Sequence, residues 1–465
     1  MNQIGEWINN DNHFKYFLIF LFFSIKVNAQ QYPLDTQLSF VNYNPPTQLP
    51  GYLTPIYDEN FDTKVTRISA ISEFGGIRQD LTHDYSKRQV WNSDQSLISL
   101  SYGKILDGKS YELLASAAIG SMGWSNIKPY RNYGTSSNSN YFRVYELNPQ
   151  TFENRIVFTK TFSEYNRMSH WTAESNLSAD DKYVALYGTK SSTGDSCWVI
   201  VYNVENDVVV SETNLNTNIA NIDWVSMSQS GNYVVVLYKS RGMGVHQGTK
   251  SFDRSMNLVK HLTNTTQHGD LGYDQNGNEV WVFYDMGYLK SATLEGGEGV
   301  IQYASMQGGH VSCRNINRPG WAYVSDDGDA NTPKDYPAFR EIFAVKLDGK
   351  PNGVITVNRF TKHYTETNQK YNHYAKTSVS PDGRKVVFNS NMSINAVKAQ
   401  NFPFAFIVEV NQSTETIIAN AGDDVSICQG ASTTLTATGG STYLWSTGET
   451  TASITVSPEQ TTTYT

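Results

Sequence analysis

The sequence predicts an all-β protein, and two of its features carry that prediction. Only 17% of the 465 residues are charged, whereas 13% are aromatic, including 29 tyrosines. Short runs in which Val, Leu, Tyr and Phe alternate with polar residues recur along the chain, each bounded by Asp, Asn, Ser or Gly. Such runs are typical of strands joined by tight turns. The net charge is −8 and no long basic cluster occurs, which argues against a nucleic-acid partner.

The first 29 residues have the three parts of a signal peptide. The stretch HFKYFLIFLFFSIKVNAQ (His13–Gln30) contains a lysine, an apolar core from Phe17 to Ile25, and a V-N-A end. This core is too short to span a membrane. We therefore expect cleavage near Ala29 and a secreted or cell-surface monomer without a membrane-spanning segment. Residues 30–49 are expected to form a linker.

A hairpin pattern repeats through the middle of the chain. Its clear copies are VWNSDQSLISLSYG from Val90, NLSADDKYVALYGT from Asn176, SMSQSGNYVVVLYK from Ser226, GYDQNGNEVWVFYD from Gly272 and SVSPDGRKVVFNSN from Ser378. The step is 50 residues from Asp181 to Gly231 and 46 residues from Gly231 to Gly277. Four strands in a unit of about 45 residues is the pattern of a propeller blade.

Residues 50–410 are long enough to hold roughly seven such units. The sequence therefore predicts a seven-bladed β-propeller domain over residues 50–410. The segment Thr54–Ser69 is expected to add a strand to the last blade and so to close the ring. An array of Ig-like sandwiches would also contain many strands, but it would need an independent core in each module and longer repeats.

The composition changes after residue 410. Residues 411–417 are expected to form a linker, and residues 418–465 are rich in Thr, Ser and Gly, with a period of two around Trp445. This segment resembles the small Ig-like or PKD-like modules near the C-termini of secreted proteins that use the type IX route. It predicts a partial Ig-like β-sandwich. The chain has three cysteines, which cannot all pair with one another, so no disulfide framework is expected.

Four histidines occupy a similar place in the repeat, 8 to 11 residues before a turn residue; they are His83, His170, His268 and His373. The inner strands of a propeller begin at one end of its central channel, so these imidazoles are expected to share one mouth. Asp223 joins them from the third hairpin. Imidazole suits such a site because it titrates near neutral pH, accepts protons and binds metals. For each histidine alone, a hydrogen bond to a neighbouring blade is the alternative.

A second group of residues suggests a metal site. His310 and Cys313 are separated by two residues, a spacing compatible with joint ligation of zinc. His268, Asp270 or His261 would complete a closed, structural site. The alternative is that Cys313 is a buried free cysteine.

A long connection that contains glycines carries two more candidates. Arg254 can hold a carboxylate through two hydrogen bonds, and Tyr238 stands at the end of a predicted strand. Tyr238 can instead belong to the core. Arg88 and its neighbour Lys87 are further cationic candidates, for which solvated side chains are the simpler interpretation.

Taken together, HDYSKRQVWNSDQS, SHWTAESNLSADDKY, QHGDLGYDQNGNEV, GGHVSCRNINRPGWAYVS and NHYAKTSVSPDGRKV resemble a known group of enzymes. The chain is similar to seven-bladed propeller polysaccharide lyases of the oligogalacturonate-lyase and ulvan-lyase kinds over residues 54–410. The resemblance implies an anionic polysaccharide as partner and β-elimination on a uronic-acid-containing glycan, with a zinc ion that supports the fold.

The resemblance also implies roles for particular residues. It makes Arg254 the clamp on the substrate carboxylate, and His170 and Tyr238 the base and the acid in either order. His83, Arg88, His373 and Asp223 would bind the substrate. A second histidine of the ulvan-lyase pattern is absent, and Lys190 stands near its place.

Two rival functions stay open at the level of sequence. One is a non-catalytic cell-surface propeller that binds glycan or protein. The other is a hydrolytic glycosidase with paired carboxylates, for which Asp223, Asp270 and Glu174 are candidates. No G-x-S-x-G stretch occurs, which argues against an α/β-hydrolase.

Overall fold

The protein was analysed as a computed structural model. It describes residues 34–35, 40–76, 81–136, 138–168, 174–266, 269–296, 300–304, 308–328, 336–348, 356–366, 371–400, 402–410, 425–428, 430–437 and 443–465. Tyr32–Asn411 form one compact unit, and Gln412–Thr465 belong to a second. The predicted signal peptide lies outside the described residues. Within the described part of the chain, none of the helices has the length and apolar character needed to cross a membrane.

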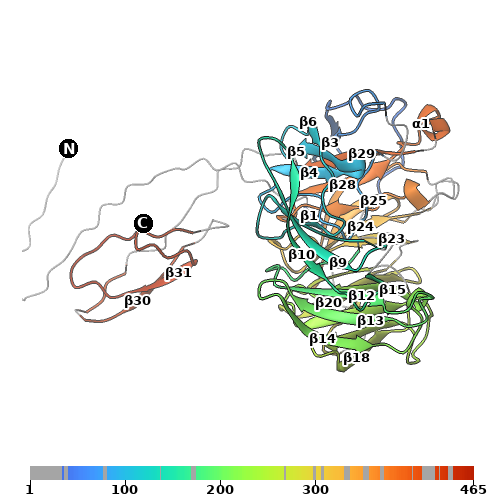
Figure 1. The fold of residues 1–465 in the computed structure, drawn as a ribbon. Helices are drawn as coiled ribbons and strands as arrows, with labels where there is room; N and C mark the ends of the chain where they lie inside the picture. The colour runs from blue at the N-terminus through green and yellow to red at the C-terminus, as the bar shows by residue number, and fades with distance from the viewer. Residues whose placement is uncertain are drawn as a thin grey trace, which may run out of the picture. The chain divides into compact units, whose positions relative to one another are not determined.

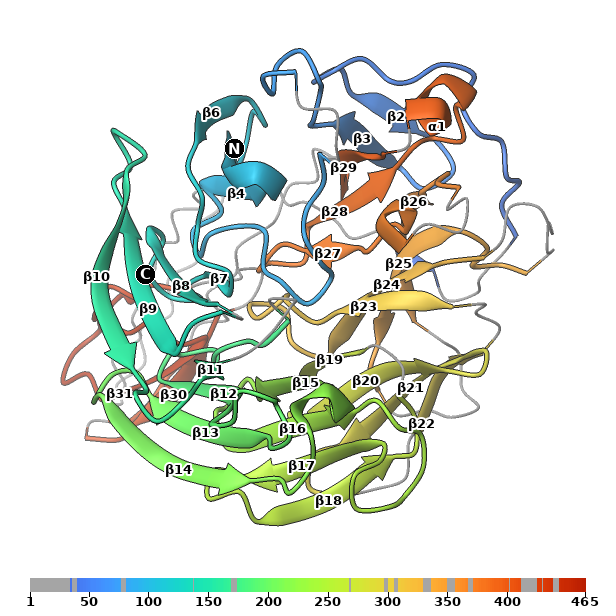
Figure 2. The same cartoon turned by 45° about the vertical axis from the view of Figure 1, so that its right-hand side comes forward.

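The first unit is a seven-bladed β-propeller, as predicted (Figures 1 and 2). Blade 1 contains β4 (Leu97–Leu100), β5 (Lys104–Asp107) and β6 (Leu113–Ser116); blade 2 contains β7 (Gly123–Trp124), β8 (Arg131–Thr135), β9 (Tyr141–Leu147) and β10 (Asn154–Thr161). Blade 3 contains β11 (Arg167–Met168), β12 (Tyr183–Thr189), β13 (Trp198–Asn203) and β14 (Val208–Asn214). Blade 4 contains β15 (Ile222–Met227), β16 (Tyr233–Tyr238), β17 (Thr249–Asp253) and β18 (Leu258–Thr263).

The remaining blades complete the ring. Blade 5 contains β19 (Gly269–Tyr273), β20 (Glu279–Asp285), β21 (Tyr288–Thr293) and β22 (Val300–Ala304). Blade 6 contains β23 (Gly309–Ser312), β24 (Trp321–Asp326), β25 (Glu341–Lys346) and β26 (Val357–Lys362), with β1 (Leu34–Asp35) at its edge. Blade 7 contains β27 (Ser378–Val379), β28 (Lys385–Ser390), β29 (Phe404–Val410), β3 (Thr63–Arg67) and β2 (Ile56–Asp58). The described helices are η1 (Ser101–Gly103), η2 (Ile219–Asn221), η3 (Tyr371–His373) and α1 (Asn395–Gln400).

The ring is closed by strands from both ends of the propeller segment. β3 pairs antiparallel with β29, with Val65 opposite Val408 and Thr63 opposite Val410. The strand predicted within Thr54–Ser69 therefore exists, and it lies in the last blade as expected. This pairing satisfies the outer edge of β29 and joins parts of the chain about 340 residues apart, which removes an exposed sheet edge.

The recurring turns have a common chemical cause. In the blade 5 hairpin, Asp274 Oδ1 accepts hydrogen bonds from the backbone N–H groups of Asn276 (2.8 Å) and Asn278 (2.9 Å). Gly277 lies between them with a φ of +82°, which favours glycine. Asp180 and Asp382 make the same kind of bond in blades 3 and 7. The Asp/Asn/Ser/Gly signature of the sequence is thus a set of side chains that shape the turns themselves.

The blades pack face to face and bury both sides of their middle strands. Five of the six residues of β16 are buried, and the same holds for most of β20. Trp224 in blade 4 and Trp281 in blade 5 meet with ring centroids 5.2 Å apart. Because such a strand is covered on both faces, Val, Leu and Phe run together in its sequence, as in VVVL of β16 and WVF of β20.

The second unit contains β30 (Thr433–Thr436) and β31 (Ser453–Val456), which pair antiparallel. Trp445 is buried with Ile454 and Val456, and its Nε1 donates to the carbonyl oxygen of Thr451 at 2.8 Å. These contacts form a small core of their own. The Ig-like sandwich predicted here stays a prediction. Cys428 is an exposed free thiol, and the two other cysteines are buried free thiols.

Two buried histidines link the stability of the propeller to pH. Burial lowers the pKa of both His83 and His363 to about 4, from an ordinary value of 6.5. His363 Nε2 donates to the carbonyl oxygen of Asp326 at 2.7 Å, and its Nδ1 accepts from the backbone N–H of Thr365 at 3.1 Å. A proton on Nδ1 would face another donor, so the ring is held neutral.

We expect the propeller to lose stability as the pH falls from about 6.5 to about 4. The unfolded chain binds protons at these histidines below its pKa of about 6.5, whereas the folded chain does so only near 4, so stability present above 6.5 is lost in that window. The loss should be up to roughly 3 kcal/mol per histidine. Thermal unfolding followed by circular dichroism measures it. In His363→Gln the loss should shrink, and a pH profile equal to that of the unchanged protein would contradict this account.

Candidate functional site at the mouth of the propeller

The innermost strands of the blades begin at the same end of the propeller. In blade 4, Ile222 at the start of β15 lies opposite Tyr238, and Met227 at its end lies opposite Val234. β19, β23 and β27 pair in the same way with β20, β24 and β28. Figure 2 shows these inner strands around the axis. The end where they begin is the mouth end, and the end with their connecting turns is the turn end.

Side chains from five blades meet at the mouth end. We define the mouth cluster as Tyr85 and Lys87 of blade 1, Glu174 of blade 3, Asp223 and Trp224 of blade 4, His310 and Asp327 of blade 6, and Tyr371, Tyr374 and Lys376 of blade 7. Side chains from different blades therefore meet at this end, but they are not the four histidines, Tyr238 and Arg254 predicted to share it. Asp223 is the one predicted substrate-binding residue among the members of this cluster, and His310 was predicted as a metal ligand.

A lysine–glutamate pair crosses the mouth from blade 1 to blade 3. Lys87 Nζ lies 2.6 Å from Glu174 Oε2, and the lysine side chain is fully buried. The same ammonium group lies 4.3 Å from the ring centroid of Trp224, whose Nε1 donates to the backbone oxygen of Glu174 at 2.8 Å. A carboxylate and an aromatic face thus replace the water that a buried ammonium would lose. The interpretation that Lys87 is solvated was wrong.

An imidazole–carboxylate pair comes from blade 6. His310 Nδ1 lies 2.9 Å from Asp327 Oδ2, and both side chains are buried. In the neutral ring this bond holds the proton on Nδ1, so the lone pair is on Nε2. The ring of His310 is bordered by Tyr85, Tyr371 and Tyr374, with centroids 5.6, 6.1 and 5.8 Å away.

A second lysine of the mouth cluster, Lys376, packs against two of the tyrosine rings. Lys376 Nζ lies 4.2 Å from the ring centroid of Tyr371 and 6.0 Å from that of Tyr85. The backbone oxygen of Lys376 receives a hydrogen bond from His83 Nε2, which ties blade 7 to blade 1. Tyr371 is about half exposed, so this side of the cluster faces solvent.

Burial and the carboxylates set the protonation states of the cluster. Burial raises the pKa of Asp223, and the nearby charge of Glu174 raises it further, while Lys87 opposes the shift. Burial and the Glu174 carboxylate hold the pKa of Tyr85 well above its usual range. Burial raises the pKa of Tyr371 to about 12. Both phenols therefore keep their protons at neutral pH and can donate them.

The predicted histidines divide into three groups. His170 and His268 lie outside the described residues. His83 is at the mouth end, but its ring is buried, neutral and bonded to the Lys376 backbone, which supports the alternative of a structural role. His373 is buried in η3, two residues after Tyr371, and its backbone oxygen accepts from Thr365 Oγ1 at 2.8 Å.

Arg88 does not join the mouth cluster. It forms an ion pair with Asp84, and its Nη2 donates to the backbone oxygen of Gly120 at 2.9 Å. Lys87 and Arg88 lie in a turn in which the backbone N–H of Arg88 donates to the carbonyl oxygen of Tyr85 at 3.1 Å. Their side chains leave this turn toward different partners, Glu174 for Lys87 and Gly120 for Arg88. The expected contact of Arg88 with substrate is therefore not supported by its position.

Tyr238 and Arg254 are not brought together. Tyr238 lies at the mouth end of β16, but it is 2% exposed and packs in the core between blades 3 and 4. Arg254 follows β17, whose five residues span roughly 15 Å toward the turn end. There it stacks on Tyr183, 4.6 Å from the ring centroid. The expectation that Arg254 and Tyr238 share one opening was wrong, because β17 carries the chain to the other end of the blade.

The predicted zinc site is also not formed by its two local ligands. His310 and Cys313 are three positions apart in an extended segment, which directs them to opposite sides. His310 binds Asp327, whereas Cys313 packs against Gly272 and a buried apolar cluster. Burial raises the pKa of the Cys313 thiol well above its ordinary value, which disfavours the thiolate that zinc needs. Among the described residues, no three His, Cys, Asp or Glu side chains converge on one point.

Two other predicted zinc ligands, Asp270 and His261, do not join His310 and Cys313. The Asp270 carboxylate accepts from Arg314 Nε (3.0 Å) and Nη2 (2.9 Å), and from the backbone N–H groups of Leu271 and Cys313. It is a fully buried link between blades 5 and 6, which leaves it no role as a metal ligand or a glycosidase carboxylate. His261 lies on β18, the outermost strand of blade 4.

Five members of the mouth cluster were not predicted from the sequence: Tyr85, Tyr371, Tyr374, Lys376 and Asp327. Most of these residues belong to a short sequence motif that occurs in two blades. HDYSK in blade 1 and YNHYAK in blade 7 both place a tyrosine and a lysine within three or four residues of a histidine that precedes an inner strand. The histidine was taken as the functional member of each motif, whereas the tyrosine and lysine are the ones that reach the mouth.

Among the comparisons with known proteins, only solved structures bear on the fold. No family model matches the chain, and no curated protein matches it. An oligogalacturonate lyase solved in complex with manganese aligns with a TM-score of 0.51 and 14% identity, covering 77% of this chain and 96% of that one. An oligogalacturonate lyase from Vibrio parahaemolyticus aligns with a TM-score of 0.49 and 13% identity, covering 78% and 97%. At such identities, the likeness to the manganese complex shows the propeller fold alone.

The ion pair between Asp270 and Arg314 is expected to stabilise the packing of blade 5 against blade 6. Removing the carboxylate leaves Arg314 buried without its counter-charge, so Asp270→Ala should lower the free energy of unfolding by about 3–5 kcal/mol. Denaturant titration measures this loss. Asp274→Ala, which removes a partly exposed carboxylate from the turn directly after β19, is the matched control and should cost about 1 kcal/mol or less. Equal losses in the two variants would refute the role of Asp270.

Proposed function

We propose that this protein is a secreted polysaccharide lyase that cleaves a uronic-acid-containing glycan by β-elimination at the mouth of its propeller. One observation carries the proposal. A carboxylate-bound imidazole, phenols that keep their protons and a lysine meet at the mouth of a propeller that resembles an oligogalacturonate lyase in fold. The signal-peptide pattern of residues 1–29 supports export.

The reaction needs three chemical contributions. A cation must neutralise the uronate carboxylate, which makes the C5 proton more acidic; a base must remove that proton; and an acid must protonate the leaving glycosidic oxygen. Lys376 is our candidate for the cation, because its Nζ lies 4.2 Å from the ring centroid of the half-exposed Tyr371, whereas the Lys87 side chain is fully buried. Proton and electrons balance when the C5–H and C4–O bonds break and a C4–C5 double bond forms.

His310 is the candidate base and Tyr371 the candidate acid. Asp327 orients the ring of His310 and stabilises the imidazolium that forms when Nε2 takes a proton. Tyr371 has a pKa of about 12, so its phenol carries at neutral pH the proton that the leaving oxygen needs. His170 stays a predicted base or acid, and Asp223 and His373 stay predicted substrate-binding residues. No step of this scheme runs through a metal, although the oligogalacturonate lyase of similar fold was solved with manganese.

A second candidate function is glycan binding without cleavage. One observation in its favour is that Lys87 is already ion-paired with Glu174. Another is the group of tyrosine rings at the mouth, since aromatic faces bind sugar rings without taking part in a reaction. The two functions differ in one observable product, the unsaturated uronate.

The lyase proposal predicts an ultraviolet absorbance that rises when the protein is incubated with polygalacturonate, ulvan or alginate. His310→Ala and Tyr371→Phe should each lower the rate by about 10²–10⁴-fold, because each removes a proton-transfer group. Lys376→Ala should lower it as well, because the carboxylate would lose its neutralising charge. Lys182→Ala, which removes an exposed lysine at the turn end, should leave the rate unchanged.

Two results would contradict the lyase proposal. Binding of the polymer without any rise in absorbance on any substrate would favour the non-catalytic propeller. A rise that persists at full rate in His310→Ala and Tyr371→Phe would place the chemistry outside this group of residues.

A further inference from the structure

We propose a second saccharide-binding site at the turn end of blade 2, built to hold an anionic sugar residue. A cavity of about 470 Å³ lies there between the β7–β8 and β9–β10 connections. Its lining includes Lys128, Tyr130, Arg131, Glu146, Glu153 and Arg155. All of them are described residues, and none belongs to the mouth cluster.

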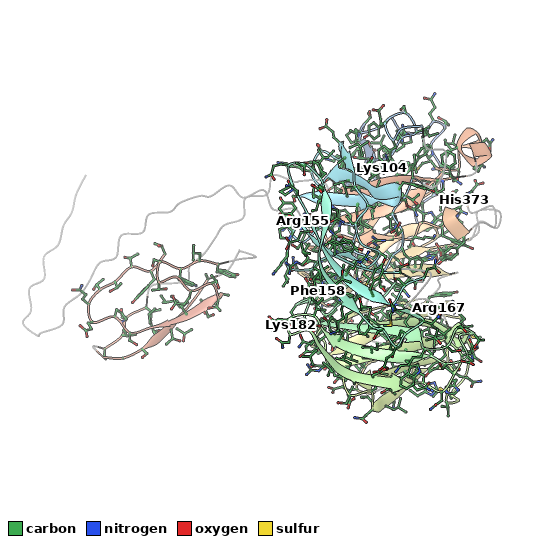
Figure 3. The ribbon with its side chains drawn as sticks, viewed as in Figure 1. Lys104, Arg155, Phe158, Arg167, Lys182 and His373 are labelled. Carbon is green, nitrogen blue, oxygen red and sulfur yellow. The ribbon has the colours of Figure 1, made fainter. Side chains whose placement is uncertain are left out.

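The cavity is far from the mouth because of the direction of the strands. β8 begins and β9 ends at the turn end, and the connections that form the cavity lie there. Figure 3 labels Arg155, at the start of β10, and His373, in η3 at the mouth end, on opposite sides of the propeller. A ligand in this cavity would therefore leave the mouth accessible.

The charges of the cavity favour an anion. Lys128, Arg131 and Arg155 bring three positive charges against the two negative charges of Glu146 and Glu153, which leaves one net positive charge. Glu146 Oε1 lies 2.6 Å from Arg131 Nη2, and its Oε2 lies 3.8 Å from Arg155. Arg131 Nε is buried and has no hydrogen-bond partner among the described residues, so Glu146 satisfies only part of this guanidinium.

The other lining groups favour a sugar over a small inorganic anion. Tyr130, Pro129, Leu147 and Pro149 supply apolar surface, which suits the C–H face of a pyranose ring. Carboxylates such as Glu153 accept hydrogen bonds from sugar hydroxyls but repel a bare anion. The volume suits one or two sugar rings. A uronate carboxylate and a sugar sulfate offer the same chemistry to the arginines.

The walls of the cavity are held in place before any ligand arrives. Leu147 N donates to the backbone oxygen of Tyr130 at 2.8 Å, which joins the two connections directly. Asn148 Oδ1 accepts from the backbone of Gln150 and Thr151 and shapes the β9–β10 turn. Asn92 of blade 1 donates to the backbone oxygen of Pro129 at 3.0 Å. A preformed site loses less entropy on binding than one that must be ordered.

Isothermal titration calorimetry of the whole protein tests this site. The probes are a trigalacturonate, a sulfated galactan trisaccharide and a neutral galactotriose. The pocket variant is Lys128→Ala/Arg155→Ala; Lys128 lies in the β7–β8 connection and Arg155 at the start of β10, and both side chains are exposed. The matched control is Lys109→Ala/Lys182→Ala, which removes the same charge from the turn ends of blades 1 and 3.

We expect the pocket variant to bind an anionic trisaccharide at least about tenfold more weakly, with one binding site fewer per chain, while the control and His310→Ala keep that site. Binding of the uronate probe, the sulfated probe or both identifies the source of the anion. Equal binding in the pocket variant and the unchanged protein, an equal loss in the control, or equal binding of the neutral probe would overturn the proposal. A failure of the β-elimination assay would leave this result untouched, so the two proposals fail separately.

Discussion

The pairing of β3 with β29 is the constraint on which the rest of the propeller depends. Each blade is a small sheet that buries both faces against its neighbours, so every blade needs two neighbours, and only a closed ring supplies them all. The hydrogen bonds between Thr63–Arg67 and Phe406–Val410 make blade 7 from both ends of the propeller segment. With the ring closed, the inner strands start at one end of the axis, and residues nearly 300 positions apart, such as Tyr85 and Tyr371, become neighbours.

Closure also explains why charged groups are tolerated at the mouth. Lys87, Glu174 and Asp223 come from three different blades, and burial of any one alone would cost several kcal/mol. Together they compensate one another, since the lysine lies between a carboxylate at 2.6 Å and the face of Trp224. The His310–Asp327 pair follows the same rule on the other side of the tyrosines.

The sequence allowed the fold to be predicted in some detail but the site only in part. Turn chemistry such as Asp274–Gly277 and runs such as VVVL are local, so the hairpins and the closing strand were predictable. Blade 2 gave little signal, because its β7–β8 connection, SNIKPY, lacks the Asp and Gly of the recurring turn. A group of side chains at the mouth was expected because the inner strands of all blades start at the same end. Which residues belong to that group depends on the direction in which each side chain points. Alternation of side chains along an extended segment separates His310 from Cys313, the turn at residues 85–88 separates Lys87 from Arg88, and the course of β17 takes Arg254 away from the mouth.

A double-mutant cycle on Lys87 and Glu174 tests the convergence at the mouth most directly. The free energy of unfolding would be measured for Lys87→Met, Glu174→Gln and the double variant by denaturant titration. If the two side chains meet across the mouth, each single change strands a buried partner, and the double variant should be more stable than the sum of the single losses by about 0.5–3 kcal/mol. Losses that simply add would show that blades 1 and 3 do not meet there, and would contradict the account.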